Sequence, residues 1–491
     1  MPVTLQDLTR EPDFLEKTFR YCEKNKLFRC VSISARINRP LDADVAFGSV
    51  RSLVLKYPLL FSRLSGEEPN ITYVPLEAIR FEDVFVVRND AEVCFKAENA
   101  QTDLLTDASF HENHVQKKPL WRFVYHKKTG WITFQSAHCF TDGGSVVAYL
   151  KDFVEGLNHV AGVTAKDMVF NLQDDLSLLK YGISPGFFDR VNYQTNLATR
   201  LVAHAIKSAI WLWPGVVPAV LEKKRVESFF VDRTPEPFSP DSFFESEHII
   251  DEKSSLNLTT PTFLNIDSDS LQAILRQCRA HNVRLQSYIL LVYVHTVNSQ
   301  CPDMYTSKNL KVAVAASFRN RFESLQSHNK YLGGGDVRFE DGFYTYAATF
   351  FLEPGTEFSW PSVQKYHNFL HQKVNSEEWI RQYYFAHHTM TAENYMDHRL
   401  GNEKDTLFIS STNLGHIDVL QYDDPSKFQI EDILFAPMTG ALMGTHHVTL
   451  SSTAKGGLNI GLSNGDPNVK DWAVFKRELK KNLVLFSTQS V

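Results

Sequence analysis

Residues 131–153 read WITFQSAHCFTDGGSVVAYLKDF and predict a strand, a turn with paired glycines and a helix in direct succession. His138 stands at the end of the strand, and Asp142 follows four residues later. A side chain at a strand end is held rigidly and can project into a cleft. Gly143 and Gly144 remove side-chain bulk beside it and permit a tight turn.

This pattern supports two interpretations. In the first, neutral His138 takes a proton from a hydroxyl or amine and returns it to a leaving group, while Asp142 holds the turn by pairing with a buried arginine. In the second, His138 makes a local hydrogen bond and Asp142 caps the following helix. Cys139 adds a rival nucleophile for a covalent acyl intermediate, but alternation along the strand should turn it away from the His138 face.

The composition excludes several classes of protein. The chain has 491 residues, of which 43% are hydrophobic and 22% charged, and this length predicts about two to four domains. A formal net charge of −6 argues against nucleic acid as a partner. Six scattered cysteines without a CxxC pair fit a reducing compartment. The opening MPVTLQDLTREPDFLEK carries charges where a signal peptide needs an apolar core, so we expect an intracellular protein.

A charged segment with three prolines, residues 221–249, divides the chain into two halves. Strand and helix patterns alternate on both sides of it, which is typical of an α/β fold. We therefore predict an N-terminal domain over residues 1–220 that carries the His138 motif, a linker over 221–249, and a C-terminal domain over 250–491.

Two helices raise the question of membrane contact, although no run of 18 apolar residues predicts a spanning helix. Residues 197–221 repeat apolar pairs on one face and include two tryptophans; this helix either packs on the domain or lies in a membrane interface. Residues 471–491 combine an apolar face with lysines and an arginine, which indicates either a core-docked terminal helix or a basic helix on a membrane surface.

The remaining histidine patterns predict no metal site. HENHV at residues 111–115 lacks the spacing of a zinc protease helix, and His367 and His371 have no carboxylate at a known motif spacing. The adjacent pairs 387–388 and 446–447 would point to opposite faces if they lie on strands.

HxxxDG at a strand–helix junction resembles the CoA-dependent acyltransferases that share the chloramphenicol acetyltransferase-like fold. YPLLFSRL at residues 57–64 resembles a stretch of the plant members, and KPLWRFVY at residues 118–125 resembles the family's strand before the catalytic His. SFRNRF at residues 317–322 stands where plant members carry D-x-R-x-R, with Ser317 in place of the Asp. The plant D-F-G-W-G motif is absent.

Two further stretches resemble the fungal alcohol O-acetyltransferases. SSTNLG at residues 410–415 is similar to their S-N-x-G stretch, and residues 430–466 resemble the end of those enzymes. The ordered set, from about Glu11 to the C-terminus, resembles this fungal family within the HxxxD acyltransferases.

The resemblance implies two chloramphenicol acetyltransferase-like domains in a pseudo-dimer, with a channel between them and His138 at its midpoint. Acetyl-CoA, a co-substrate rather than a bound cofactor, would enter from one face and the acceptor from the other. His138 would then be the general base. In this family the Asp of the motif points away from the substrate and binds an arginine, for which Arg63 and Arg319 are both candidates to pair with Asp142.

The resemblance also implies where substrate contacts lie. Thr412 or Asn413, at a strand end in the second half, could donate a hydrogen bond to the oxyanion of the transition state. We expect Gly143, Thr412, Asn413 and Arg319 to contribute to the substrate site.

The resemblance favours a hydrophobic alcohol as the acceptor, with ester formation. A sphingoid-type long-chain amine and a sterol hydroxyl are alternatives, since the same base serves all three. A non-catalytic lipid-surface binding protein is an alternative of a different class. We expect a monomer in the cytosol or on the cytoplasmic face of the endoplasmic reticulum or of lipid droplets.

Overall fold

The computed structural model places most of the chain. It describes residues 2–25, 29–67, 70–89, 95–96, 102–160, 162–190, 197–213, 261–300, 309–319, 340–376, 378–400, 408–417, 424–436, 446–464, 469 and 471–488. The predicted linker over residues 221–249 lies outside this described part of the chain.

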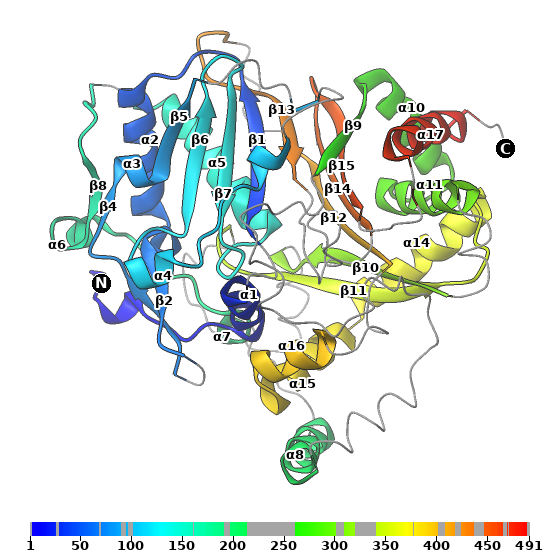
Figure 1. Ribbon diagram of the computed structural model, residues 1–491, viewed down its shortest axis with the longest axis horizontal. Helices are drawn as coiled ribbons and strands as arrows, with labels where there is room; N and C mark the ends of the chain where they lie inside the picture. Colours follow the sequence, from blue (N-terminus) through cyan, green and yellow to red (C-terminus); the bar gives the residue numbers. More distant parts are fainter. Residues whose placement is uncertain are drawn as a thin grey trace.

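Two β-sheets organise the molecule and lie next to one another in Figure 1. The first has five strands, in the order β13 (Ile430–Phe435), β1 (Val31–Ile37), β7 (Trp131–Ser136), β6 (Trp121–His126) and β5 (Phe85–Arg88). The second has six, in the order β11 (Thr345–Leu352), β10 (Leu310–Ser317), β12 (Ile409–His416), β14 (His446–Thr453), β15 (Gly457–Asn464) and β9 (Thr262–Ile266). Two small sheets pair β2 (Ser62–Ser65) with β3 (Thr72–Pro75) and β4 (Ala78–Arg80) with β8 (Met168–Asn171).

Helices pack against both sheets. The helices of the first half are α1 (Phe14–Lys24), α2 (Ala43–Lys56), α3 (Phe81–Val84), α4 (Asn113–Gln116), α5 (Gly143–Leu157), α6 (Leu172–Asp175), α7 (Phe187–Arg190) and α8 (Leu197–Leu212). Those of the second half are α10 (Ser268–Ala280), α11 (Leu285–Gln300), α14 (Trp360–Asn375), α15 (Glu378–Thr389), α16 (Ala392–Leu400) and α17 (Trp472–Leu485). Short 3-10 turns occur at η1 (Gln6–Leu8), η2 (Pro58–Phe61), η3 (Thr102–Leu105) and η4 (Leu176–Leu178).

The predicted α/β organisation is therefore present, with one feature that the sequence pattern did not predict. Strand β13, from the second half of the sequence, completes the first sheet by pairing antiparallel with β1, so that Ile33 lies opposite Phe435. Strand β14 then bonds to β13 through side chains: the Thr449 hydroxyl donates to the Phe435 carbonyl at 2.6 Å, and the Ser451 hydroxyl to the Ile433 carbonyl at 3.2 Å. These contacts join the two sheets.

The C-terminal helix α17 packs against the second sheet's core. Phe475, Leu479 and Leu483 are buried in the same apolar cluster as helix α11, and the Tyr288 hydroxyl of α11 donates to the Leu483 carbonyl at 2.7 Å. The structure thus supports the core-docked interpretation of this helix, because its apolar face is already covered. Across the described residues, no helix has the length and apolarity that crossing a membrane requires.

Candidate active site

The loop after β7 carries His138 and is held by hydrogen bonds at both ends. The Ala137 amide donates to the Leu120 carbonyl at 2.8 Å, which extends the β6–β7 pairing by one residue. The Thr141 hydroxyl bonds to the Ala137 carbonyl and to the Ser136 hydroxyl, both at 2.8 Å. The turn therefore presents His138 from a fixed backbone, as the sequence predicted.

His138 lies in a largely apolar environment between the two halves. Its ring contacts Phe19 of α1, with ring centroids 3.9 Å apart, and Phe343 near β11, at 5.2 Å. Nδ1 lies 2.5 Å from the Thr141 carbonyl oxygen, which can only accept a hydrogen bond, so Nδ1 carries the hydrogen. In the neutral ring the lone pair is therefore on Nε2. Burial lowers the pKa of His138 to about 4, so the imidazole is neutral at physiological pH.

Asp142 is fully buried and serves two purposes that the sequence left as alternatives. It is the N-cap of α5, where one carboxylate oxygen accepts the Ser145 amide at 3.0 Å. The other oxygen accepts hydrogen bonds from the second half: Arg319 Nη1 at 2.8 Å, the Tyr344 amide at 2.8 Å and the Thr345 hydroxyl at 2.7 Å. Burial raises the pKa of Asp142, but the Arg319 charge and these hydrogen bonds outweigh it and lower the pKa to about 2.

The arginine that pairs with Asp142 is Arg319, which lies at the end of β10. Its guanidinium also donates to the Gly342 carbonyl at 2.9 Å and to the Ser145 hydroxyl at 3.0 Å. Arg63, the other candidate, instead donates to the His114 carbonyl at 3.3 Å. A role of Arg319 in substrate binding stays a prediction, because the contacts described for it are structural.

The paired glycines make room for the second half. A Cβ at Gly144 would lie 2.6 Å from Arg319 Nη1, and a Cβ at Gly143 would lie 2.8 Å from Leu414 Cδ2. The second position explains why HxxxD is followed by two glycines here: any side chain at residue 144 would displace the arginine that binds Asp142.

Strand β12 places Thr412 toward this loop and Asn413 away from it. A Cβ at Gly143 would be 4.0 Å from Thr412 Cγ2. Asn413 is the next residue along the strand and therefore points to the opposite face. It is exposed, and its Oδ1 accepts the Gly415 amide at 2.7 Å. Contact of either residue with substrate stays a prediction, but the geometry favours Thr412 as the closer of the two.

His447 of β14 is the residue that sequence reasoning missed. It pairs in register with Ser410 of β12, and its Nδ1 is hydrogen-bonded to the Ser410 hydroxyl. Its Nε2 is buried and has no hydrogen-bond partner among the residues that the structure describes. Burial and the nearby His138 lower the pKa of His447 to about 3. The sequence predicted that neighbouring side chains of a strand here would point to opposite faces. His446 indeed faces away from His447, and its Nδ1 lies 2.9 Å from the Tyr293 hydroxyl oxygen.

Cys139 points into a buried polar cluster rather than toward a substrate. Its amide donates to Glu23 Oε1 at 3.4 Å, and His114 Nε2 lies 3.4 Å from Glu23 Oε2. Burial raises the pKa of the Cys139 thiol well above its usual range, which disfavours the thiolate that covalent catalysis needs.

Among the described residues, one group of three side chains could in principle bind a metal ion. The ligand atoms of Glu23, His114 and Cys139 lie within 4.8 Å of one another. The Leu64 amide donates to His114 Nδ1 at 3.2 Å, so hydrogen bonds account for this group. His387 and His388 lie in helix α15, so the strand alternation considered for this pair does not apply to it.

Comparison with protein families gives one strong match. A family model described as alcohol acetyltransferase matches residues 13–481. Among curated proteins, the N-acetyltransferase SLI1 of Saccharomyces cerevisiae is 20% identical over 323 residues, which is 63% of this chain and 64% of that protein. The match thus spans less than two thirds of the relative's length.

Solved structures agree on the fold. The TRI3 trichothecene 15-O-acetyltransferase from Fusarium sporotrichioides has a TM-score of 0.60 at 10% identity, covering 98% of this chain and 99% of that one. The first condensation domain of the calcium-dependent antibiotic synthetase has a TM-score of 0.58 at 12% identity, covering 98% and 97%. These likenesses over nearly the whole chain confirm the predicted fold class.

Proposed function

The chain belongs to the alcohol acetyltransferase family, and from this premise we propose that it transfers an acetyl group from acetyl-CoA to the hydroxyl of a hydrophobic alcohol. His138 is the general base of this proposal. The observation that carries it is the orientation of the ring: the bond from Nδ1 to the Thr141 carbonyl at 2.5 Å assigns the lone pair to Nε2.

The low pKa of His138 suits this role in one respect and limits it in another. A value of about 4 keeps the ring neutral, so the base form is always present at physiological pH. A base of such low pKa is also weak, so its driving force for proton transfer has to come from coupling with C–O bond formation. Binding of the substrates would move water out of the site and leave the imidazole as the nearest proton acceptor.

The reaction is a direct transfer without a covalent enzyme intermediate. The acceptor hydroxyl gives its proton to His138 Nε2 while its oxygen bonds to the thioester carbonyl carbon. The carbonyl oxygen becomes an oxyanion, and its collapse breaks the C–S bond. The departing thiolate takes the proton back from His138, which yields the ester and CoA.

Two groups of the second half are suited to stabilise the oxyanion. The Thr412 hydroxyl belongs to a side chain that faces Gly143. His447 offers Nε2, a buried atom without a partner in the structure. When the Ser410 hydroxyl donates to Nδ1, Nε2 of neutral His447 carries a hydrogen and becomes a donor. Asn413 stays a third candidate, although its Oδ1 is already bonded to Gly415.

A second acceptor class is an amine. The similarity to the yeast N-acetyltransferase SLI1 favours considering it, and the same base would remove the proton of the attacking nitrogen. A sphingoid-type long-chain amine is the candidate of this class, and a sterol is the candidate for a larger alcohol. The proposal includes no metal. It also treats the protein as a monomer in the cytosol or on the cytoplasmic face of the endoplasmic reticulum or lipid droplets.

A product assay tests the proposal. Purified protein is incubated with radiolabelled acetyl-CoA and, separately, isoamyl alcohol, a sterol and phytosphingosine, and the products are separated by class. We expect label in an ester, with the label lost in His138→Ala. Label in an amide would transfer the proposal to the amine class. Loss of acetyl-CoA no faster than its spontaneous hydrolysis, without any acylated acceptor, would contradict both and leave a non-catalytic lipid-surface protein.

A further inference from the structure

Helix α8 stands at the margin of the molecule, at the bottom of Figure 1, and rests on α15. Among its side chains that the structure describes, Ala203 is the buried one. The helix therefore makes a narrow contact with the body and leaves most of its surface in solvent.

One side of the exposed surface of α8 is apolar, although Arg200, His204 and Lys207 on another side are exposed as well. Leu197 is 65% exposed, Leu201 60%, Val202 49% and Leu212 52%. At 100° per residue these four fall within an arc of about 140°. The other exposed residues in that arc are small: Ala198, Ala205 and Ser208. Trp213, just beyond the helix, is 59% exposed. A surface helix ordinarily buries such a face and exposes its polar one.

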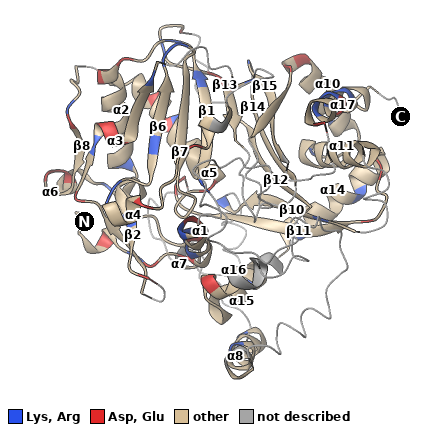
Figure 2. Cartoon of the chain, in the orientation of Figure 1, with Lys and Arg blue, Asp and Glu red and all other residues tan. Residues whose placement is uncertain are grey.

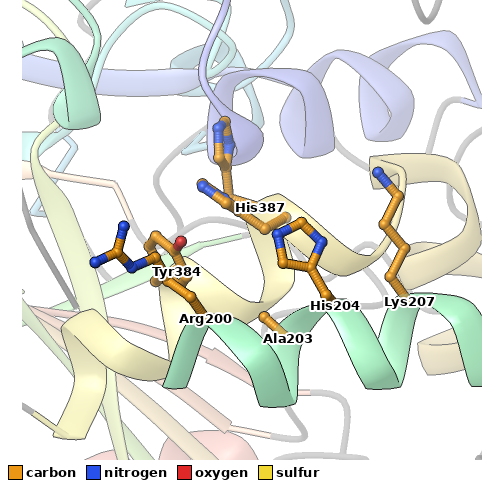
Figure 3. Close-up of a pocket in the computed structure, with 7 residues that line it drawn as sticks. Arg200, Ala203, His204, Lys207, Tyr384 and His387 are labelled. Carbon is orange, nitrogen blue, oxygen red and sulfur yellow. The ribbon is translucent and has the colours of Figure 1, made fainter. Parts of the chain in front are cut away.

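The basic residues of α8 occupy a separate arc of about 60° and face α15. Figure 3 shows Arg200, His204 and Lys207 reaching from α8 over Tyr384 and His387 of α15. These side chains, with Ala203 and His388, line a cavity of about 280 Å³.

This cavity is cationic. Within the parts of the chain that the structure places, neither Arg200 nor Lys207 forms an ion pair, and residues 197–213 contain no Asp or Glu. His204, Lys207 and His388 line this cavity together, and the charges of His204 and Lys207, besides burial, lower the pKa of His388. On the side of α15, Asp13 of the α1 N-cap places a carboxylate oxygen 3.8 Å from His387 Nδ1.

We propose that α8 and the cavity beneath it form a docking site for an anionic membrane surface. The apolar arc from Leu197 to Leu212 enters the interface, and the cavity takes a lipid phosphate. An interfacial helix sinks its apolar face about 5–10 Å into the headgroup boundary, and a helix is about 10 Å across. The side of α8 that carries Arg200 and Lys207 then lies at the depth of the phosphates.

The combination of features selects a membrane over a protein partner. An apolar face alone would suit either. Here it is joined to uncompensated positive charge and a terminal tryptophan, the composition that favours the boundary between acyl chains and anionic headgroups. Helix α17 is also basic, but Phe475, Leu479 and Leu483 of its apolar face are buried in the second core. The site is independent of the proposed chemistry and also suits a protein whose acceptor is membrane-soluble.

Vesicle flotation of the full chain tests this inference. Phosphatidylcholine vesicles are compared with vesicles that contain about 30% phosphatidylserine. We expect the protein to float with the anionic vesicles and to bind them at least tenfold more tightly than the neutral ones. Binding equal to both compositions, or to neither, would overturn the proposal.

Substitutions on the two arcs separate their contributions. Leu201→Glu and, in a separate variant, Leu197→Glu should each weaken binding to anionic vesicles at least tenfold. Two positions are used so that a folding defect in one variant does not decide the result. Arg200→Ala with Lys207→Ala should remove the preference for anionic vesicles and leave only weak binding to both. Val115→Glu, at a residue that is 76% exposed on α4, is the matched control and should bind like the unmodified protein. If a folded Leu201→Glu and Leu197→Glu bind as the control does, α8 is not the docking site.

Discussion

Removing the Asp142 carboxylate tests whether the motif's aspartate holds the two halves of the molecule together. Asp142 belongs to the first half, while Arg319, Tyr344 and Thr345 belong to the second, and all three bond to the same carboxylate oxygen at 2.7–2.8 Å. We expect Asp142→Ala to lower both the stability and the activity, because the Arg319 guanidinium would remain buried without its counter-charge.

The structure sets the size of this effect. Lowering the pKa of Asp142 from 3.8 to about 2 means that about 2–3 kcal/mol favours the charged form after the burial penalty. Losing one partner of a buried pair costs about 3–5 kcal/mol. An unfolding entropy of about 2.1 cal/mol/K per residue is about 1 kcal/mol/K for this chain, so Tm should fall by about 3–5 °C. The contribution of the carboxylate is present above the unfolded pKa and is lost as pH falls through about 2.

The assay is a thermal melt at pH 7 of the unmodified protein, Asp142→Ala, Arg319→Ala and the double variant. Glu431→Gln is the matched control, since its ion pair with Arg36 at 3.1 Å also joins the two halves but is solvent-exposed, worth about 0–1 kcal/mol. The stability lost in the double variant should be smaller than the sum of the losses in the two single variants, because each single variant leaves one buried charge without its partner. A Tm for Asp142→Ala equal to that of the control would refute the reasoning, as would full additivity of the two single substitutions.

Three further predictions concern the chemistry. Because burial lowers the pKa of His138 to about 4, the acidic limb of a kcat/KM profile should lie near pH 4 in protein shown to be folded; a limb near 6.5 would mean a solvated histidine. Cys139→Ala should keep kcat within about threefold, because the thiol lies beside Glu23 and His114; loss of an acyl-enzyme signal together with activity would argue for covalent catalysis. His447→Ala should lower kcat by about 10²–10³ with little change in the acceptor KM if Nε2 stabilises the oxyanion, whereas an unchanged kcat would remove it from the site.

The local features of the site could be predicted from sequence because they depend on neighbouring residues. The strand, the turn and the helix of residues 131–157 follow from spacing, and so does the capping position of Asp142. The identity of the arginine could not be predicted, since Arg319 is 177 residues away and spacing carries no information at that range. The clash of a Cβ at Gly144 with Arg319 gives a physical reason for the second glycine only once that contact is known.

His447 was missed for a similar reason. Alternation predicted that His446 and His447 face opposite ways, but not that one of them meets the His138 loop. That depends on β13 joining the first sheet and on β14 bonding to β13 at Phe435, next to Gly143. Helix α8 shows the converse limit: its apolar pattern was visible in the sequence, but which face would be covered depends on tertiary packing.

The role of His138 is tested most directly by the rate of acetyl transfer in His138→Ala. The measurement is kcat/KM for the best acceptor of the panel, with the variant's fold checked by its Tm and by α-helical circular dichroism. General base catalysis predicts a loss of about 10²–10⁴ in kcat/KM with a Tm close to that of the unmodified protein. A folded His138→Ala protein that acetylates its acceptor at the unmodified rate would contradict the account.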